Sequence, residues 1–306
     1  MGDRLKDRVA IVTGAGRGIG RGESLLLASE GAAVIVNDFG GSAAGEGGEK
    51  TPADEVVEEI KAAGGKAAAN YGNIAQFSTG EELVKQAIDT FGRLDIVVNN
   101  AGILRDRMVF NMAEEEWDAV IAVHLKGHFN LTRHACVVFR QQRSGVIVNT
   151  SSESGLGNMG QANYSAAKEG IVGLTRTVAR DMGKYGVRCN AIRPRAGTRL
   201  VISDEMKAAA QRGGAAGMQV QALEAFEKAN PPDAVAPMVV WLCTDEAANV
   251  NGRNFLVAGN HIGLYSEPEL IANIRTEGTW DIDTVAKLAP AELTKDLTNQ
   301  WAPKEE

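Results

Sequence analysis

The chain is poor in several features that would place it in other protein classes. Its 306 residues include three cysteines, Cys136, Cys189 and Cys243, which lie far apart and form no C-x-x-C pair. An odd, scattered set of cysteines argues against a disulfide framework or a zinc finger and suits a reducing compartment. No apolar run approaches the roughly 18 residues of a membrane span, and the charged start MGDRLKDR does not resemble a secretion signal. We therefore expect a cytoplasmic protein with no membrane partner.

Basic residues are too dispersed for a protein that binds nucleic acid. The chain has 32 Lys and Arg against 39 Asp and Glu, a formal net charge of -7, and no basic block. Contacts to a phosphate backbone require clustered positive charge, which is missing. We expect small-molecule chemistry rather than DNA or RNA binding.

The sequence does have a regular alternation of short apolar runs and longer amphipathic segments. The runs are rich in β-branched residues, which suits strands buried on both faces. They lie at 9–14, 33–38, 66–71, 94–100, 145–151, 187–192 and 254–259. Helical patterns lie at about 19–30, 52–63, 76–91, 114–141, 161–185 and 234–244. This order predicts an α/β protein, a single-domain Rossmann fold with a doubly wound, seven-stranded parallel sheet and helices on both faces.

Three segments fall outside this alternation. Residues 39–50 are glycine-rich and predict a mobile surface loop, and residues 202–230 lie where a flap over a substrate would fall. We expect one nucleotide-binding domain over 1–262 and a C-terminal extension over 263–306 that packs on the domain or on a neighbouring subunit. The helices at 114–141 and 161–185 have larger apolar faces than one sheet layer needs. We therefore predict a homodimer or homotetramer.

The first predicted strand ends in VTGAGRGIG, which also opens the first helix. Its glycines Gly14, Gly18 and Gly20 follow the spacing G-x-x-x-G-x-G, because Ile19 stands where G-x-G-x-x-G needs a small residue. Glycines allow a sharp turn and let backbone N–H groups and the helix N-terminus approach a pyrophosphate. No GK[ST] follows, which excludes a P-loop. The loop is predicted to bind a dinucleotide.

Asp38 ends the second predicted strand, where a carboxylate accepts hydrogen bonds from ribose hydroxyls of a dinucleotide. Its charge also repels a 2′-phosphate, so NAD is favoured over NADP. Arg17 in the glycine loop argues the other way, because an arginine there sometimes contacts that phosphate. The coenzyme is therefore predicted to be NAD, with NADP as the alternative.

Tyr164 and Lys168 stand one helical turn apart in NYSAAKEG. Tyrosine moves a proton poorly at its usual pKa of about 10, and bringing that pKa near 7 needs about 4 kcal/mol of phenolate stabilisation. A lysine on the same helix face supplies part of it, and Ser152 is placed to hydrogen-bond the same substrate oxygen. The spacing alone is common by chance, but it accompanies a dinucleotide loop, NNAG and TSS. Together these features predict an enzyme that interconverts a secondary alcohol and a ketone.

With TGAGRGIG, NNAG, Ser152, Tyr164 and Lys168 in place, residues 5–260 resemble the short-chain dehydrogenase/reductase family. The resemblance implies that Tyr164 donates or accepts the proton, that Lys168 lowers its pKa and holds the nicotinamide ribose, and that Ser152 positions the substrate oxygen. It also implies a set of coenzyme contacts from Gly14, Arg17, Gly18, Ile19, Gly20, Asp38, Asn73, Ile74, Asn100, Ala101, Gly102, Tyr164, Lys168, Pro194, Gly197 and Thr198.

The asparagine that many family members use as a fourth catalytic residue is replaced here by His124. In the family a water on the backbone carbonyl of this residue relays the proton, and His124 is a candidate to keep that carbonyl in place. His124 and His128 also form an i, i+4 pair, but Leu125 stands where H-E-x-x-H needs glutamate, and no third ligand is evident. We expect no metal site.

Within the family, VIVNDFGG, NNAGILRDR, VHLKGHF and GQANYSAAK are similar to the (3R)-3-hydroxyacyl-CoA dehydrogenase parts of peroxisomal multifunctional enzymes, some of which act on 17β-hydroxysteroids. The resemblance implies an NAD-dependent dehydrogenase of a 3-hydroxyacyl-CoA or a steroid-like 17β-alcohol. Arg105 and Arg107 are candidates to hold the phosphates of CoA. An NADPH-dependent 3-oxoacyl thioester reductase is the alternative within enzymes, and a non-catalytic NAD-binding sensor is the alternative outside them.

Overall fold

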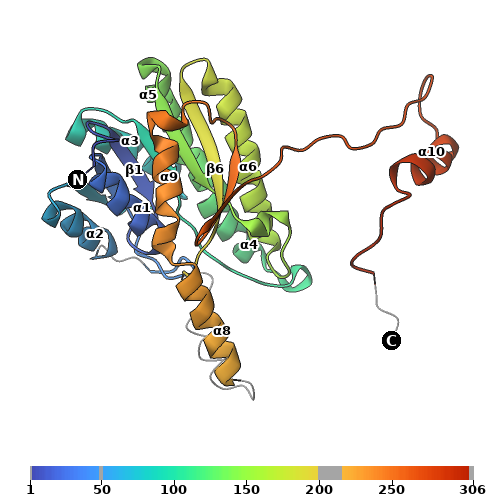
Figure 1. Cartoon of the computed structure of the whole chain (residues 1–306), viewed down its shortest axis with the longest axis horizontal. Helices are drawn as coiled ribbons and strands as arrows, with labels where there is room; N and C mark the ends of the chain where they lie inside the picture. Colours follow the sequence, from blue (N-terminus) through green and yellow to red (C-terminus); the bar gives the residue numbers. More distant parts are fainter. Residues whose placement is uncertain (1, 48–50, 199–215, 303–306) are drawn as a thin grey trace. The chain divides into compact units, whose positions relative to one another are not determined.

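In the computed structural model, which describes residues 2–47, 51–198 and 216–302, the apolar runs form one sheet in the order β3-β2-β1-β4-β5-β6-β7-β8 (Figure 1). The first seven strands are parallel, and each overlaps its predicted range. They are β1 (Val9–Thr13), β2 (Ala33–Asn37), β3 (Lys66–Asn70), β4 (Ile96–Asn99), β5 (Gly145–Thr150), β6 (Val187–Arg195) and β7 (Asn254–Ala258).

The sheet has one strand more than the seven predicted, and this eighth strand is antiparallel. β8 (His261–Leu264) runs antiparallel to β7, and Ala258 pairs with His261. Gly259 and Asn260 form the connection, and Gly259 has a positive φ of 52°. A glycine–asparagine pair between two short runs is a hairpin signal, and HIGL is too short to show a strand pattern by itself.

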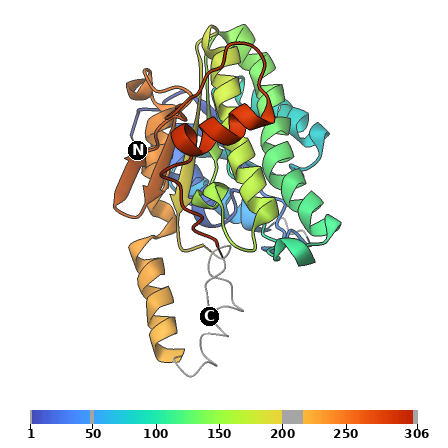
Figure 2. The same ribbon diagram turned by 90° about the vertical axis from the view of Figure 1, so that its right-hand side faces the viewer.

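Helices cover both faces of the sheet (Figures 1 and 2). On one face lie α1 (Gly18–Ser29), α2 (Thr51–Ala62) and α9 (Ala236–Cys243). On the other lie α3 (Phe77–Phe91), α5 (Gly127–Gln142) and α6 (Ala162–Gly183). The doubly wound α/β architecture predicted from the alternation is therefore confirmed.

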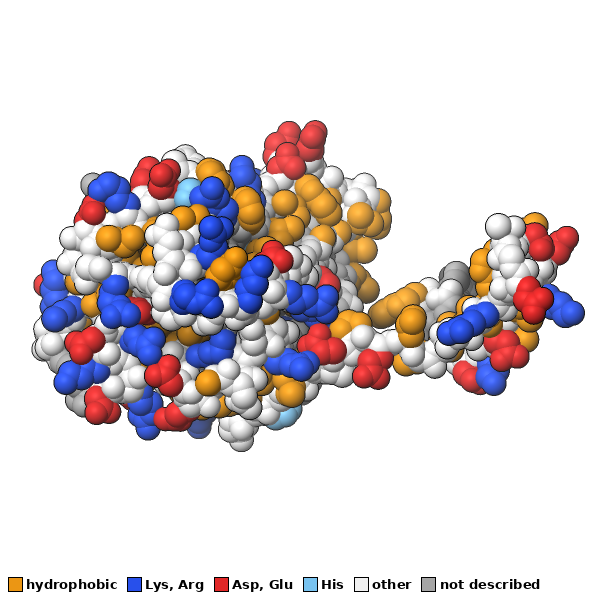
Figure 3. All heavy atoms as spheres, turned by 90° about the horizontal axis from the view of Figure 1, so that it is seen from above, with side chains coloured by type: hydrophobic (Ala, Val, Ile, Leu, Met, Phe, Trp, Pro, Cys, Tyr) orange, Lys and Arg blue, Asp and Glu red, His pale blue; other side chains and the backbone are white. Residues whose placement is uncertain are grey.

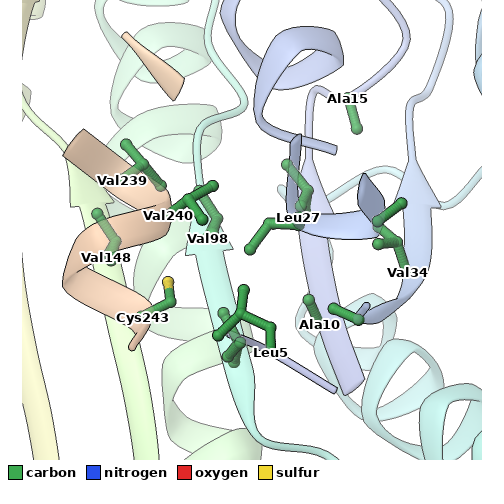
Figure 4. Close-up of a cluster of buried hydrophobic side chains, with 14 of the residues drawn as sticks. Leu5, Ala10, Ala15, Leu27, Val34, Val98, Val148, Val239, Val240 and Cys243 are labelled. Atoms are coloured by element: carbon green, nitrogen blue, oxygen red, sulfur yellow. The ribbon is translucent and has the colours of Figure 1, made fainter. Parts of the chain in front are cut away.

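The two cores follow from the period-two geometry of the strands. Alternate residues of a strand point to opposite faces, so Val12 joins the core under α1 and α9 while Ile11 joins the core under α3 and α5. Figure 4 shows the first of these cores, where Leu27 of α1 and Val239 of α9 lie over the strands. The strands read as continuous apolar runs because both of their faces are covered.

The predicted helix at 114–141 consists of three parts. α4 (Glu114–Ile121) passes into a π-helical turn, Ala122–Lys126, which passes into α5. The π turn contains the predicted site residue His124. Single π turns within helices are frequent at functional sites.

The remaining predictions concern segments at the edges of this architecture. Most of the predicted flap at 202–230 lies outside the described residues, and α8 (Ala216–Ala229) covers its described part. The chain divides into the units Met1–Tyr265 and Ser266–Glu306, so the predicted boundary at residue 262 falls within β8. The second unit contains α10 (Ile282–Leu288), followed by a π turn, Ala289–Leu293.

Acidic and basic side chains are interspersed on the face of the molecule that Figure 3 shows. Across the described parts of the chain, none of the helices combines the length and the apolarity needed to cross a lipid bilayer.

Candidate active site

The glycine loop connects β1 to α1 in a conformation that side chains would block. Gly14 has a φ of +63°, and a Cβ there would lie 2.7 Å from the Cα of Ala101. A Cβ on Gly20 would lie 2.4 Å from the carbonyl oxygen of Gly14. The loop can therefore lie against the NNAG segment and expose its backbone toward a ligand only with glycines at these positions. This cradle fits the pyrophosphate of a dinucleotide.

Asp38 lies just beyond the end of β2, and backbone groups hold its carboxylate. Its Oδ2 accepts a hydrogen bond from Gly16 N at 2.8 Å, and its Oδ1 accepts one from Gly40 N at 2.7 Å. A Cβ on Gly16 would lie 2.9 Å from the same Oδ2. The sequence reasoning missed Gly16, although the extra glycine within GAGRG was a visible signal.

The predicted residues come together around one cavity of about 410 Å³. Gly20 is the exception, because it is buried behind the loop in α1. The loop predicted at 39–50 also contributes Phe39, Gly41, Ser42 and Gly45 to the lining. The predicted residues that line the cavity are Gly14, Arg17, Gly18, Ile19, Asp38, Asn73, Ile74, Asn100, Ala101, Gly102, His124, Ser152, Tyr164, Lys168, Pro194, Gly197 and Thr198.

Tyr164 lies in the first turn of α6 and faces the cavity. Its backbone N–H donates to Asn163 Oδ1 at 2.7 Å, and the Asn163 amide donates to the carbonyls of Arg105 and Glu116. Burial raises the pKa of the Tyr164 phenol to about 12, whereas a hydrogen bond with Ser152 lowers it. Desolvation outweighs this hydrogen bond, so the pKa of the phenol is raised on balance. The lowering predicted from the sequence also depends on the charge of a bound nicotinamide and stays a prediction.

Lys168 is buried one turn further along α6. Its Nζ donates to the carbonyl oxygen of Thr150 at 2.6 Å and lies 5.4 Å from the centre of the Tyr164 ring. Its own carbonyl accepts from Ser151 Oγ at 2.7 Å, which fixes the helix against the end of β5. Burial lowers the pKa of Lys168 to about 7. The lysine therefore releases its proton near neutral pH, unlike an exposed lysine.

His124 braces the cavity wall. Its Nε2 lies 3.1 Å from Ile103 N and 2.8 Å from Ile103 O, and its ring meets the Tyr164 ring edge-on at 5.0 Å. Gly102 makes room for it, because a Cβ there would lie 2.3 Å from the imidazole Cε1. Burial, and then the charge of Lys168, lower the pKa of His124 well below its usual value, so the ring is neutral. Its backbone carbonyl accepts from the N–H of Gly127, the first residue of α5.

The second histidine of the i, i+4 pair is His128, in the first turn of α5. His128 is also buried, and burial lowers its pKa to about 3. Among the residues the structure describes, no cluster of three His, Cys, Asp or Glu side chains could hold a metal ion.

Two chain segments that leave the cavity meet again beside it. Arg107 N donates to Gly160 O at 2.8 Å, so the segments after Ile103 and after Ser152 lie side by side. Their apolar side chains are exposed, with Phe110 at 76% and Met159 at 79%. We call this surface the apolar lip, and its members are Met108, Val109, Phe110, Leu156 and Met159.

The two arginines proposed for CoA phosphates make contacts within the chain. Arg105 Nε donates to the carbonyl oxygen of Ala44 at 3.0 Å, which holds the segment beside the glycine-rich loop. Arg107 Nε donates to Glu116 Oε1 at 3.1 Å, an ion pair between an exposed arginine and a half-buried glutamate. Both side chains therefore brace the entrance segments, and an acidic ligand would have to compete with these partners.

Comparison with known proteins agrees with this geometry. The sequence pattern of short chain dehydrogenases matches residues 8–199. The chain is 44% identical to the hydroxyacyl-CoA dehydrogenase ChsB1 of Mycobacterium tuberculosis, over 98% of this chain and 90% of that protein. It is 47% identical to the peroxisomal multifunctional enzyme type 2 of Mus musculus, over 85% of this chain but only 33% of that protein.

A solved structure has the same fold over most of the chain. The crystal structure of a short chain dehydrogenase from Mycobacterium avium is 43% identical, covers 92% of each chain and superposes with a TM-score of 0.76. The fold of this chain thus has a counterpart in a solved structure. The chain belongs to the short-chain dehydrogenase family, and it is an oxidoreductase that binds a nicotinamide dinucleotide and acts on CH–OH groups.

Proposed function

We propose that the chain is an NAD-dependent dehydrogenase that interconverts a (3R)-3-hydroxyacyl-CoA and the corresponding 3-oxoacyl-CoA. The observation that carries the proposal is that Ser152, Tyr164 and Lys168 line the same cavity as the glycine loop. Similarity over nearly the whole chain to a protein named as a hydroxyacyl-CoA dehydrogenase supports the substrate class. A steroid-like 17β-alcohol is the second candidate, because the apolar lip suits any substrate with a large apolar part.

A substrate panel tests this function. The chain would be incubated with NAD or NADP and with (3R)- and (3S)-3-hydroxyacyl-CoAs of several lengths and 17β-hydroxysteroids, and reduced coenzyme would be followed by absorbance. Turnover of the (3R) series with NAD supports the proposal. Faster reduction of 3-oxoacyl thioesters with NADPH would favour the reductase, and inactivity on every substrate would favour a sensor.

The residues of the cavity divide the work in this reaction. Ser152 holds the substrate oxygen by a hydrogen bond, and Tyr164 takes the hydroxyl proton during oxidation or returns it during reduction. A bound nicotinamide supplies the hydride acceptor or donor, and its positive charge when oxidised favours the phenolate. Lys168 exchanges a proton near neutral pH, so it can donate a proton to Tyr164 or accept one from it.

The dinucleotide would be held by the elements that form the cradle. The backbone of the glycine loop and the N-terminus of α1 face its pyrophosphate, and Asp38 accepts hydrogen bonds from its adenosine ribose. The amide of Asn100 donates to the carbonyls of Thr13 and Gly14 at 3.0 and 3.1 Å, which fixes the loop against β4. These contacts favour a rigid site with little reorganisation on binding.

Replacing Asp38 with asparagine tests the choice of coenzyme. The amide keeps the shape and one acceptor oxygen but removes the charge that repels a 2′-phosphate. We expect the NADP to NAD ratio of kcat/KM to rise at least about tenfold, because a hydrogen bond to a charged group is worth about 1.5–3 kcal/mol. Initial rates with both coenzymes provide the measurement.

Glu55→Gln is the matched control for this change. Glu55 is exposed on α2 and lies outside the cavity lining. Its replacement by glutamine therefore removes one negative charge, as Asp38→Asn does, without removing a contact to the dinucleotide. Its coenzyme ratio should stay within about twofold of the original protein, since exposed charges are screened by salt. A ratio that moves equally in both variants would refute a specific role for Asp38.

Polar replacement of the apolar lip tests the substrate class. We expect Phe110→Ser and Met159→Ser to raise KM for long-chain 3-hydroxyacyl-CoA about tenfold, because burying such a side chain is worth about 1.5–3 kcal/mol. KM for a short-chain substrate should not change, since its acyl chain does not reach the lip. Ile88→Ser on α3, an apolar residue 38% exposed, is the control, and an equal loss for short and long chains would contradict the prediction.

The assembly and the location of the protein belong to the same proposal. A homodimer or homotetramer in the cytoplasm fits a metabolic dehydrogenase, and sedimentation of the purified chain would measure its state of association. We also propose that the extension beyond Tyr265 packs on its own domain or on a neighbouring subunit. Sedimentation of a chain shortened after Tyr265 would show whether the extension contributes to association.

A further inference from the structure

Arg193 is a buried guanidinium behind the catalytic residues. It lies near the end of β6, directly before Pro194 of the cavity lining, and only 2% of the residue is exposed. Its Nη1 donates to the carbonyl oxygen of Ser152 at 2.6 Å, and its Nη2 donates to Glu169 Oε2 at 2.6 Å. One side chain therefore joins the serine segment to the helix that carries the tyrosine and the lysine.

The backbone of the serine segment packs directly against this ion pair. Gly155 belongs to the short helical turn η3 (Glu153–Leu156), which begins just after Ser152. A Cβ on Gly155 would lie 2.8 Å from Arg193 Nη1 and 2.9 Å from Glu169 Oε2. Because no side chain separates the turn from the pair, a shift of the guanidinium would also shift the turn.

The far side of the guanidinium is covered by Tyr265. The centre of the guanidinium lies 5.2 Å from the centre of that ring, within the range of a cation–π contact. Tyr265 follows β8, and its backbone N–H donates to the carbonyl of Asn254 at 3.0 Å. The arginine is thus confined between the serine segment, α6 and the end of β8, and it has little freedom to adopt another rotamer.

This arrangement is a poor way to gain stability. Burying a charge costs several kcal/mol before its partners offset the loss, and the Nε of Arg193 has no hydrogen-bond partner. Glu169 is itself 46% exposed, so solvent weakens the pair. An apolar side chain would fill the space at lower cost. What the arginine does provide is fixed, directional geometry between two segments, since its planar group sets both hydrogen bonds at once.

We propose that Arg193 is a positioning residue that holds Ser152 at its working distance from Tyr164, acting through the Ser152 carbonyl and through Glu169 beside Lys168. The inference rests on the proposed roles of these three residues. Ser152 helps twice, by holding the substrate oxygen and by its hydrogen bond to the phenol. When the serine segment drifts, both contributions weaken, and misplacement by about 1 Å is enough to lower a rate about a hundredfold.

Replacing Arg193 with methionine removes the two hydrogen bonds and keeps an unbranched side chain in the space. We expect kcat to fall about tenfold to a hundredfold, with KM for the dinucleotide unchanged because the cradle is untouched. Loss of the Ser152 contact also raises the pKa of Tyr164, so the acidic limb of the kcat/KM profile moves to higher pH. The other groups around the phenol, Lys168, His124 and Asp106, are unaltered by this variant.

Arg188→Met is the matched control on the same strand. Arg188 donates to the carbonyls of Leu242 and Thr244, both at 2.8 Å, near the opposite end of β6. Its loss removes a guanidinium and two hydrogen bonds of the same kind, far from the cavity lining. Its kcat and pH profile should match those of the original protein even where its melting temperature falls.

Glu169 supplies the second arm of the experiment. Glu169→Gln should lower kcat about threefold to tenfold, and adding it to Arg193→Met should lower kcat no further, because the two act through one contact. If Arg193→Met does not fold, the kcat and the pH profile of Glu169→Gln alone test the inference. Unaltered kcat and pH limb in a folded Arg193→Met or in Glu169→Gln would overturn the inference. An original protein inactive on the whole panel would instead overturn the proposed function.

Discussion

Replacing Tyr164 with phenylalanine is expected to lower kcat about a thousandfold, within the range of about 10²–10⁴ that a general acid or base contributes. Phenylalanine keeps the ring that packs edge-on against His124 at 5.0 Å, so the cavity wall should hold its shape. Only the hydroxyl that moves the substrate proton is lost. Affinity for the dinucleotide, measured by titration calorimetry, should stay within about threefold, because the binding contacts that do not change in the transition state are kept.

Tyr185→Phe is the control for this change. The Tyr185 ring lies near the ends of α5 and α6, between the cations of Arg140, Arg143 and Lys184, and it takes no part in the cavity lining. It loses the same hydroxyl and should keep full activity. A Tyr164→Phe protein that retained more than a tenth of the original kcat would show that another group moves the proton.

The electrostatics of the site explain why neither half of the tyrosine–lysine pair is sufficient alone. Burial raises the pKa of Tyr164 to about 12 and lowers that of Lys168 to about 7, so both shifts favour the uncharged forms. The phenolate becomes accessible only when further positive charge or hydrogen bonds are added nearby. Ser152 provides one such hydrogen bond, which is why the position of its segment matters to the proton transfer.

The fold was predictable because its signals are local. Most of the seven predicted strands were marked by runs with β-branched residues, and the glycines of the first loop marked the turn into α1. β8 was missed because four residues, HIGL, carry too little periodicity to identify a strand. The π turn at His124 was missed because helical periodicity does not distinguish one widened turn within a long helix.

The tyrosine–lysine pair was recognisable for a related reason, since both residues fall on one helix, α6, and their catalytic roles stay a prediction. The role of Arg193 could not be predicted, because its partners Ser152 and Glu169 lie 41 and 24 residues away in the sequence and meet it only in the folded chain. Gly16 was overlooked for a similar reason, because its close approach to Asp38 arises only once β1 and β2 pair.

Glu23 could not be predicted either, and it leads to the second large effect. It lies in α1, fully buried, and neither of its carboxylate oxygens has a hydrogen-bond partner. Burial raises the pKa of Glu23 from its usual 4.5 to about 8. The folded protein therefore keeps a proton that the unfolded chain has already lost at neutral pH, and stability falls as the pH rises from about 4.5 to about 8.

Glu23→Gln should remove this dependence. Each pKa unit corresponds to about 1.36 kcal/mol, so the variant should gain about 3 kcal/mol in free energy of unfolding at pH 7. The gain should disappear near pH 4.5, where the glutamate is protonated in much of the unfolded chain as well. Urea unfolding at several pH values measures both quantities. Activity should not change, because Glu23 does not line the cavity.

The pH dependence separates this mechanism from simple repacking. Glutamine has nearly the same volume as glutamic acid, so a gain from better packing would be the same at every pH, whereas a gain from the buried carboxyl must grow between pH 4.5 and pH 8. Glu55→Gln, at an exposed position, should show neither a constant gain nor a gain that grows with pH, because an exposed carboxyl has nearly the same surroundings in the folded and unfolded chains. A constant gain would indicate better packing, and no gain at pH 8 would mean that water or a rearranged partner satisfies the Glu23 carboxylate in the folded protein.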